Sequence, residues 1–390
     1  MLRFLGLAVA ALSGLYAADL ALVGARIYPA PDSPPIVRGT IVIHNGRISE
    51  VGDTAKVKAP RGSERIDCSG LTVVAGFWNS HVHFSEPKWQ DAGSIPTETL
   101  RDQLRDMFTR YGFTSVFDTG SLLANTRTIS KRIEAREAAG PMILSCGVPF
   151  APKDATPYYL KPLELPQPAN PEQATAMARE RLNEGADGIK IFAGSWARQE
   201  PNGVVPMPVE IVKAITKEAH ARGKPVFAHP SNVAGLRAAL DGGVDVLTHV
   251  VEDDSGLTPA LVTEIRKRHM AVIPTLKLFG RNRDMIAQLR SFSDAGIPIL
   301  FGTDVGFLTD YDPAEEFKLM DRAGLTFPQI LAALTTTPAN RHGFAKQKGR
   351  IAAGMDADLV VLAGDPAQEV TGFTDVRYTI RNGTVTYSAR

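Results

Sequence analysis

The chain has 390 residues, of which 44% are hydrophobic and 22% charged, so it can bury a large core. Its 43 lysines and arginines nearly balance its 42 aspartates and glutamates, and the net charge of +1 argues against nucleic acid or an acidic membrane as the partner. The length suits one large α/β barrel with a small appendage, and we expect a small-molecule substrate.

Residues 1–18 have the layout of a secretory signal peptide. Arg3 precedes the apolar run 4–12, which is too short to span a bilayer, and serine, glycine and alanine occur among residues 13–18. The segment predicts a periplasmic or secreted protein, and an apolar N-terminal helix kept in the fold is the alternative. No other run in the sequence is long enough to cross a membrane.

The two ends of the chain share a pattern of short apolar runs separated by turns. Residues 19–72 contain such runs around Asn45-Gly46, and residues 346–390 contain them around Asn382-Gly383. Asn-Gly between apolar runs is a strong hairpin signal. The two ends therefore predict one small β-sandwich domain, with the segment 73–345 inserted between its halves.

Within 73–345 strand-like runs alternate with helical stretches, two of which close on Gly185 and Gly223. The strand-like runs are 73–84, 114–118, 142–147, 188–192, 225–229, 244–249, 271–275 and 297–304. Eight strands close a (β/α)8 barrel, the TIM barrel, which is the predicted fold. An open doubly wound sheet is the alternative, but no Gly-x-Gly-x-x-Gly follows an early strand.

Two long connections, 149–170 and 194–207, follow the third and fourth of these strands, so they are expected to rise on the catalytic face of a barrel. Four basic residues lie on loops after strands, and one of them is a candidate to hold a substrate carboxylate: Lys153, Lys161, Arg198 and Lys277. A solvated surface position is the alternative for each of them.

The first barrel strand ends in His81-Val82-His83. Because side chains on a strand alternate faces, the two imidazoles are expected to project to the same side and to supply half of a metal site. The alternative for so short a pattern is that one histidine packs in the core while the other is solvated.

Other strand ends carry further metal-competent groups. Lys190 lies in the apolar run Gly-Ile-Lys-Ile-Phe, where burial makes its amine easier to deprotonate and lets it add carbon dioxide to form a carbamate. His229, His249 and Asp304 end the fifth, sixth and eighth strands. On the face where barrel enzymes keep their sites, these groups together predict a metal centre, whereas each alone would be read as a satisfied core residue.

This set of residues resembles the ligands of the amidohydrolase superfamily, in its binuclear subtype with a carboxylated lysine, and within it the chain is similar to imidazolonepropionase-like and prolidase-like members. The resemblance implies two divalent metal ions, with zinc expected. One metal would be held by His81, His83 and Asp304, the other by His229 and His249, and carboxylated Lys190 would bridge both. A single-metal site on His81, His83, His249 and Asp304, with His229 acting on the substrate, is the alternative.

Two positions depart from the family pattern: Asn79 stands where relatives often carry aspartate, and Ala228 where some prolidase-like relatives carry histidine. The implied reaction is hydrolysis of an amide or peptide C–N bond, as in a dipeptide or an N-acyl amino acid, by metal-bound hydroxide, with Asp304 as the catalytic proton carrier. A lactonase or phosphotriesterase is the enzymatic alternative. A catalytically dead barrel that acts as a binding protein is the non-enzymatic one, and a homo-oligomer is left open.

The remaining candidate residues carry weaker expectations. Asp118, at the second strand end, is expected either to support the site or to cap a turn. Cys68 and Cys146 are expected to be buried free thiols, although an export signal leaves a bridge open. The other histidines are read as surface or packing residues: His44, His220, His269 and His342.

Overall fold

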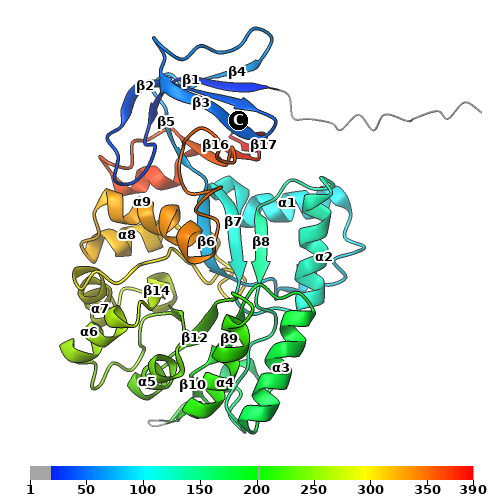
Figure 1. The fold of residues 1–390 in the computed structure, drawn as a ribbon, viewed down its shortest axis with the longest axis vertical. Helices are drawn as coiled ribbons and strands as arrows, with labels where there is room; N and C mark the ends of the chain where they lie inside the picture. The colour runs from blue at the N-terminus through cyan, green and yellow to red at the C-terminus, as the bar shows by residue number, and fades with distance from the viewer. Residues whose placement is uncertain (1–18, 201–202, 390) are drawn as a thin grey trace, which may run out of the picture.

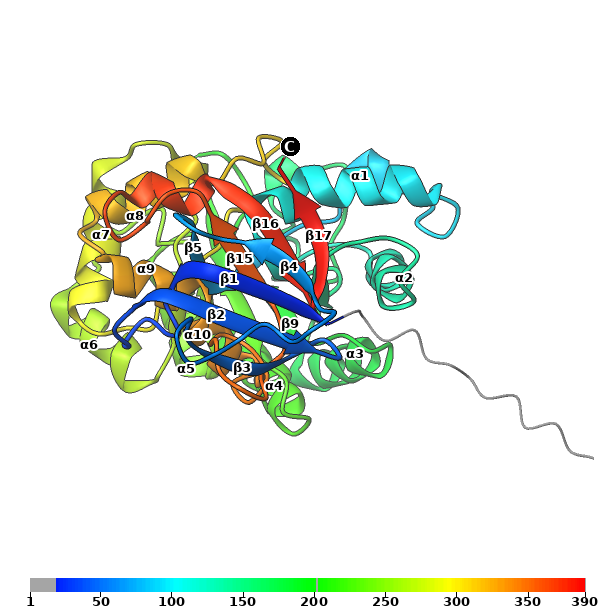
Figure 2. The same cartoon turned by 90° about the horizontal axis from the view of Figure 1, so that it is seen from above.

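A computed structural model describes residues 19–200 and 203–389, so the predicted signal peptide lies outside the described residues. Strands from both ends of the chain gather in one mixed sheet of eight strands, at the top of Figure 1 and seen from above in Figure 2. These strands are β1 (Leu20–Ile27), β2 (Ile36–His44), β3 (Arg47–Asp53), β4 (Glu64–Asp67), β5 (Thr72–Ala75), β15 (Leu359–Leu362), β16 (Val376–Arg381) and β17 (Thr384–Ser388).

The order in this sheet is β17-β16-β15-β5-β1-β2-β3, with β4 beside β1. Both predicted Asn-Gly hairpins are confirmed, since Asn45, Gly46, Asn382 and Gly383 all have positive φ and join antiparallel neighbours. The predicted two-sheet β-sandwich is not confirmed, because the strands pair in a single sheet with its own apolar core. The domain boundaries at 72/73 and 345/346 stay predictions.

Below this sheet, parallel strands alternate with helices (Figure 1). One group of parallel strands is β6 (Phe77–Val82), β7 (Phe113–Asp118) and β8 (Met142–Ser145), and the other is β9 (Ile189–Phe192), β12 (Val226–His229), β13 (Val246–Thr248) and β14 (Ala271–Ile273). A short hairpin, β10 (Gly194–Trp196) with β11 (Val204–Pro206), follows β9. The α/β class and seven of the eight predicted strands of the central segment are thus confirmed.

The α-helices surround these strands (Figure 1). They are α1 (Thr97–Met107), α2 (Leu123–Glu134), α3 (Pro171–Asn183), α4 (Val209–His220), α5 (Val233–Gly242), α6 (Pro259–Lys267), α7 (Arg283–Asp294), α8 (Ala314–Arg322), α9 (Phe327–Leu334) and α10 (Thr336–Arg341). The 3-10 helices are η1 (Pro87–Trp89), η2 (Thr109–Tyr111), η3 (Tyr158–Leu160), η4 (Leu276–Phe279) and η5 (Val370–Thr374). Among the helices of the described residues, none has both the length and the apolar character needed to cross a bilayer.

The predicted eighth strand over 297–304 is wrong, because this segment does not form a regular β-strand. Backbone hydrogen bonds tie this segment to both neighbours, but they form isolated parallel bridges, Val272 to Ile299 on one side and, just beyond the segment, Val82 to Val305 on the other. Pro298 has no N–H to donate, and Asp304 has a positive φ of 59°, so a regular ladder cannot run through the segment. Continuous pairing around a closed ring of eight strands is not found among the described residues, and this part of the barrel prediction is not confirmed.

Gly76 separates β5 of the eight-stranded sheet from β6. Sequence patterning predicts one continuous strand here. A Cβ atom at this position would lie 2.2 Å from the Thr114 hydroxyl oxygen, so only glycine fits between β5 and β6. The Gly76 N–H donates to the Asp358 carbonyl oxygen at 2.8 Å, which ties this passage to the chain segment that enters β15. The first predicted site strand is thereby anchored in the sheet made by both chain ends.

Candidate metal centre

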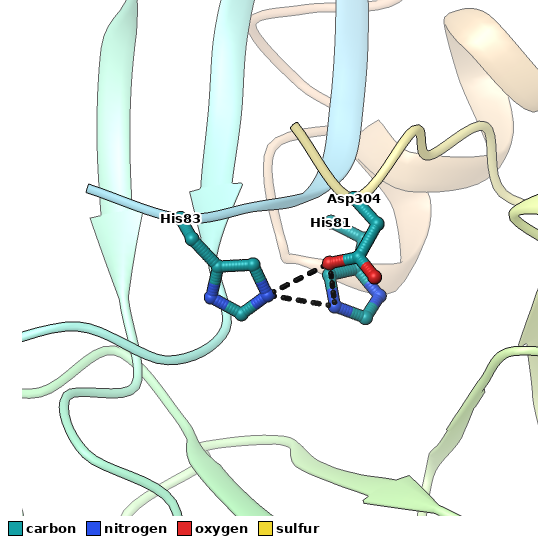
Figure 3. A group of neighbouring side chains, drawn as sticks. All are labelled: His81, His83 and Asp304. Carbon is teal, nitrogen blue, oxygen red and sulfur yellow. Dashed lines mark hydrogen bonds and ion pairs between the residues drawn. The ribbon is translucent and has the colours of Figure 1, made fainter. Parts of the chain in front are cut away.

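The end of β6 brings the first two predicted ligands together (Figure 3). His81 Nε2 lies 3.2 Å from His83 Nε2, as expected for side chains two residues apart on a strand. Asp304 Oδ1 lies 2.9 Å from His83 Nε2 and 3.3 Å from His81 Nε2. His81 and Asp304 are buried, and each is 5% exposed or less. One ligand atom from each of the three residues lies within 4.8 Å of the others, which makes the group a candidate metal site.

The unsatisfied polar atoms of this group test whether it fits a cation. Asp304 Oδ1 and His81 Nδ1 are buried without a hydrogen-bond partner, although Asp304 Oδ1 is close to both imidazoles. Buried polar groups without partners are costly, and Asp304 Oδ1 lies beside the Nε2 atoms of His81 and His83, so a cation held by these three atoms would satisfy it. The donor set of two imidazoles and a carboxylate therefore fits a divalent metal.

The other predicted ligands line the same cavity as this group, namely Lys190, His229 and His249. The His249 ring centroid lies 4.7 Å from that of His81 and 4.6 Å from that of His229, so the imidazoles form one contiguous row. Lys190 Nζ donates to the Thr248 hydroxyl at 2.5 Å. The structure thus brings all six predicted residues to one cavity, and their role as metal ligands stays a prediction.

Hydrogen bonds fix the orientation of two of these imidazoles. His83 Nδ1 lies 2.9 Å from the Gly120 carbonyl oxygen, which can only accept, so Nδ1 carries a proton, and in the neutral ring Nε2 then keeps its lone pair. His249 Nδ1 lies 2.5 Å from the Thr275 hydroxyl, whose own proton goes to the Pro274 carbonyl. Both rings therefore turn their Nε2 atoms away from these partners and leave them free for a ligand role.

Asp118 supports this orientation from the end of β7. Its carboxylate is fully buried and accepts hydrogen bonds from the Ser121 hydroxyl at 2.7 Å and from the Gly120 N–H at 3.1 Å. It thereby holds the turn whose carbonyl receives the His83 proton. Both expectations for Asp118 are met, because it caps a turn and, through that turn, positions a predicted ligand.

Asn79 links the two segments that supply the first three ligands. Its amide donates to the Thr303 hydroxyl at 2.6 Å, and its oxygen accepts from the backbone N–H groups of Thr303 and His81. The asparagine therefore holds the end of β6 against the segment that carries Asp304. A neutral amide at this position can both donate and accept, which an ionised aspartate cannot.

Burial and neighbouring charges set the protonation of the site. Burial, with the nearby cationic groups, holds the pKa values of His81 and His249 well below their ordinary range, which keeps both rings neutral as metal binding requires. Burial alone would lower the pKa of His83, but the charge of the Asp304 carboxylate beside it outweighs burial and raises the pKa. Burial lowers the pKa of the Lys190 amine to about 8 against the attraction of Asp304, so a neutral amine is accessible near neutral pH.

Two predicted ligands have strained backbones. His249 has a φ of 77° and Asp304 a φ of 59°, in the left-handed region that costs a residue other than glycine on the order of 1–3 kcal/mol. Thr275, the hydrogen-bond partner of His249, also has a positive φ of 46°. Strain concentrated at strand ends supports a functional role for these positions.

Glu252 is a site residue that sequence reasoning missed. It lines the cavity, and its two carboxylate oxygens lie 2.9 Å from His229 Nε2 and from Trp196 Nε1. Its position three residues after His249, just beyond a strand end, was the available signal. His229 faces this carboxylate rather than the cluster of His81, His83 and Asp304.

The four basic candidates for a substrate carboxylate do not line the cavity. Lys277 pairs with Asp310 at 2.9 Å and Arg198 with Glu200 at 3.8 Å, while Lys153 and Lys161 are exposed. The solvated-surface alternative therefore describes Lys153, Lys161 and Arg198, and Lys277 holds a loop. The loops 149–170 and 194–207 do reach the site, as predicted, because Tyr159 of the first lines the cavity and Trp196 of the second contacts Glu252.

The remaining cysteines and histidines match their sequence expectations. Cys68 and Cys146 are buried free thiols. His44 and His220 are largely exposed and pair with Asp19 and Asp245, and His269 is exposed. His342 is a packing residue whose ring lies among Trp78, Phe117 and Phe227, and burial lowers its pKa to about 3.

Glu316 of α8 is a buried residue that contacts the loop next to His249. It accepts the N–H groups of Leu276 at 2.9 Å and Lys277 at 2.7 Å, which directly follow Thr275. The carboxyl group thereby caps the start of η4 and holds the loop whose hydroxyl contacts His249. Burial raises the pKa of Glu316 to about 7 despite these two donors.

This raised pKa predicts a specific pH dependence of folding. Because the folded state favours the protonated carboxyl group, the stability that Glu316 contributes is present below its unfolded pKa and is lost as pH rises through about 7. We expect the free energy of unfolding of the wild type, relative to Glu316→Gln, to fall by about 2–3 kcal/mol between pH 5 and pH 8. Urea unfolding at both pH values measures this. Glu315→Gln is the matched control, and a constant difference for Glu316→Gln would show that its carboxyl group does not titrate in this range.

A parallel α/β fold with imidazoles, a lysine and a carboxylate gathered at its strand ends defines the class of metal-dependent hydrolases. The sequence profile of the amidohydrolase family matches residues 72–386, and the chain belongs to this family. It is a metal-binding hydrolase that acts on carbon–nitrogen bonds.

Individual relatives agree with this assignment over almost the whole chain. Imidazolonepropionase of Thermoplasma acidophilum is 24% identical over 385 residues, which cover 90% of this chain and 89% of that protein. Ochratoxinase of Aspergillus niger is 22% identical over 413 residues, covering 92% and 84%. The crystal structure of a Xaa-Pro dipeptidase with bound methionine matches with a TM-score of 0.81 and 22% identity, covering 95% of this chain and all of that one. The predicted resemblance to the superfamily is thereby confirmed.

Proposed function

We propose that the protein hydrolyses an amide bond with a binuclear metal centre. The observation that carries this proposal is the convergence of four imidazoles, Lys190 and Asp304 on one cavity, with three candidate ligand atoms within 4.8 Å of one another. In this proposal His81, His83 and Asp304 would hold one metal, and His229 and His249 would hold the other. Carboxylated Lys190 would be their shared ligand, and zinc is the expected metal.

Lys190 is suited to this bridging role by its surroundings. Its side chain is 3% exposed and lies in β9 opposite Phe227 of β12, and the hydroxyl of Thr248 is its hydrogen-bond partner in the structure. A charged ammonium in such a place is costly, whereas a carbamate would bring one negative charge, which would offset part of the charge of the cations. If Lys190 carries no carbamate, the single-metal arrangement on His81, His83, His249 and Asp304 remains.

The bound metals would supply an activated water and polarise the scissile carbonyl group. Asp304 is placed to accept the proton of that water, because its Oδ1 is buried beside His81 and His83 and has no other hydrogen-bond partner. The same carboxyl group can then deliver the proton to the departing amine nitrogen, which completes cleavage of the C–N bond.

Metal analysis and a substrate panel test the proposal together. We expect elemental analysis to find two metals per chain after reconstitution with zinc and bicarbonate, and we expect the reconstituted protein to hydrolyse amides, with dipeptides and N-acyl amino acids included in the panel. Lactones and phosphotriesters belong in the same panel, because the same centre serves those bonds. Cleavage of a lactone but of no amide would favour the lactonase alternative, and a protein that binds no metal would favour a binding protein.

A further inference from the structure

The cavity above the predicted ligands is apolar. Its volume is about 570 Å³, large enough for a drug-sized molecule. Leucine and phenylalanine side chains from separate segments of the chain line it, among them Leu122, Leu160, Leu163, Leu165, Phe279 and Phe307. Such a wall gains free energy by covering apolar surface of a ligand and offers few partners to a polar one.

The mouth of this cavity also collects the exposed hydrophobic residues of the protein. Seven large hydrophobic side chains are exposed in the described part of the chain, and four of them line the cavity: Leu122, Leu163, Phe307 and Tyr159, which are 69%, 55%, 49% and 39% exposed. A fifth, Tyr158, packs against Tyr159 with ring centroids 5.5 Å apart. Apolar side chains that gather at one opening, rather than lying singly over the surface, mark a binding site.

The charged groups of the cavity, apart from the predicted metal ligands, are acidic. They are Glu86, which accepts the Tyr311 hydroxyl proton at 2.6 Å and pairs with Lys88 at 3.3 Å, and Glu252, which contacts His229 and Trp196. Among the described residues no arginine lines the cavity, and its one lysine is Lys190. A substrate carboxylate placed against the apolar wall, away from the predicted metal ligands, would therefore lose water of hydration, find no arginine or lysine there to pair with, and lie near the carboxylate of Glu252.

We propose that the substrate is an uncharged amide with a large apolar group and no carboxylate. This inference rests on the proposed amide hydrolysis and narrows it, since it disfavours dipeptides and N-acyl amino acids, which carry a carboxylate. The apolar wall binds the hydrocarbon or aromatic part of the substrate, and the carboxylate of Glu252 selects against anions. The scissile carbonyl group then lies at the floor of the cavity, beside the predicted ligands.

A matched pair of amides tests the selection against charge. N-hexanoyl-phenethylamine and N-hexanoyl-L-phenylalanine differ only in the carboxylate, and we expect kcat/KM to be at least about tenfold higher for the neutral compound. Across N-acetyl to N-decanoyl phenethylamines we expect kcat/KM to rise about two- to fourfold per methylene until the cavity is filled. Preference for the carboxylate, or a flat chain-length series, would overturn the inference while leaving amide hydrolysis in place.

A binding measurement separates this inference from the catalytic proposal. We expect the neutral fluorescent probe N-phenyl-1-naphthylamine to bind the purified protein and to be displaced by N-hexanoyl-phenethylamine at least about tenfold better than by N-hexanoyl-L-phenylalanine. Leu163→Ser and Leu122→Ser should weaken probe binding at least threefold, since each removes apolar wall. Val37→Ser is the matched control, because Val37 in β2 is as exposed as Leu122 but lies outside the cavity.

The outcomes are distinguishable. If the probe does not bind, or if the two leucine variants bind it as well as Val37→Ser does, the apolar cavity is not a ligand site and the inference fails. If the probe binds and is displaced as expected while no amide is hydrolysed by the metal-loaded protein, the ligand class stands and amide hydrolysis fails.

Discussion

Asp304→Asn should lower kcat by at least about a thousandfold while the metal content stays close to that of the wild type. An asparagine oxygen can still face the metal beside His81 and His83, but an amide cannot accept and return a proton. The proton of the nucleophilic water and the protonation of the leaving amine then both lack a carrier. Steady-state kinetics on an amide of the panel, combined with elemental analysis of the same preparation, measures the two effects separately.

A surface aspartate provides the control for this variant. Asp321 lies exposed in α8, and Asp321→Asn should leave kcat and metal content unchanged. Wild-type turnover by Asp304→Asn would exclude Asp304 as the proton carrier. Loss of metal in parallel with activity would instead assign the effect to ligation, and the catalytic role of Asp304 would then need a variant that keeps the metal.

The site could be predicted from sequence because its chemistry follows a simple geometric rule. Side chains two apart on a strand share a face, so His81 and His83 were expected to converge at the end of a strand, and they do so where β6 (Phe77–Val82) ends. Parallel strands end at a common edge, so the residues that end β12 and follow β13 were expected near them. Buried lysines are rare, and Lys190 therefore stood out inside an apolar run.

The features that sequence reasoning missed depend on contacts between distant segments. Glu252 and Glu316 lie outside strand ends, and their roles are defined only by partners such as His229 and the N–H of Lys277. The segment 297–304 has the apolar composition of a strand, but the positive φ of Asp304 and the missing donor of Pro298 interrupt its pairing. Apolar patterning alone cannot distinguish a regular strand from an extended segment held by single bridges.

The pairing of strands in the single eight-stranded sheet could not be predicted from sequence patterning either. The strands and turns could be predicted from the sequence, but the pairing of the strands could not. For example, β5 pairs with β15, which joins residues almost 300 positions apart. The cavity wall is likewise assembled from loops that share no sequence signal. The substrate class that we propose therefore rests on contacts in the structure, where the apolar side chains that line the cavity could be seen together.

Replacing Lys190 tests the central element of the proposed metal site. Lys190→Ala should lose metal and at least about a thousandfold in kcat/KM, since the two halves of the site would no longer share a bridging ligand. Added acetate or propionate should restore part of both, because a small carboxylate can enter the space left by the lysine and present two oxygens in place of the carbamate. Elemental analysis and kinetics with increasing acetate measure this rescue, and circular dichroism checks that the variant is folded.

Two comparisons make the Lys190 experiment specific. Lys190→Arg keeps a positive charge and most of the side-chain volume, but a guanidinium forms no comparable carbamate and fills the space, so acetate should not rescue it. Wild-type protein reconstituted with ¹³C-bicarbonate should show a carbamate carbon signal by NMR that both variants lack. If Lys190→Ala keeps full activity, the bridge does not exist. If it does so with one metal per chain, the single-metal arrangement on His81, His83, His249 and Asp304 is the one that the remaining contacts support, because none of those residues needs Lys190 for its hydrogen bonds.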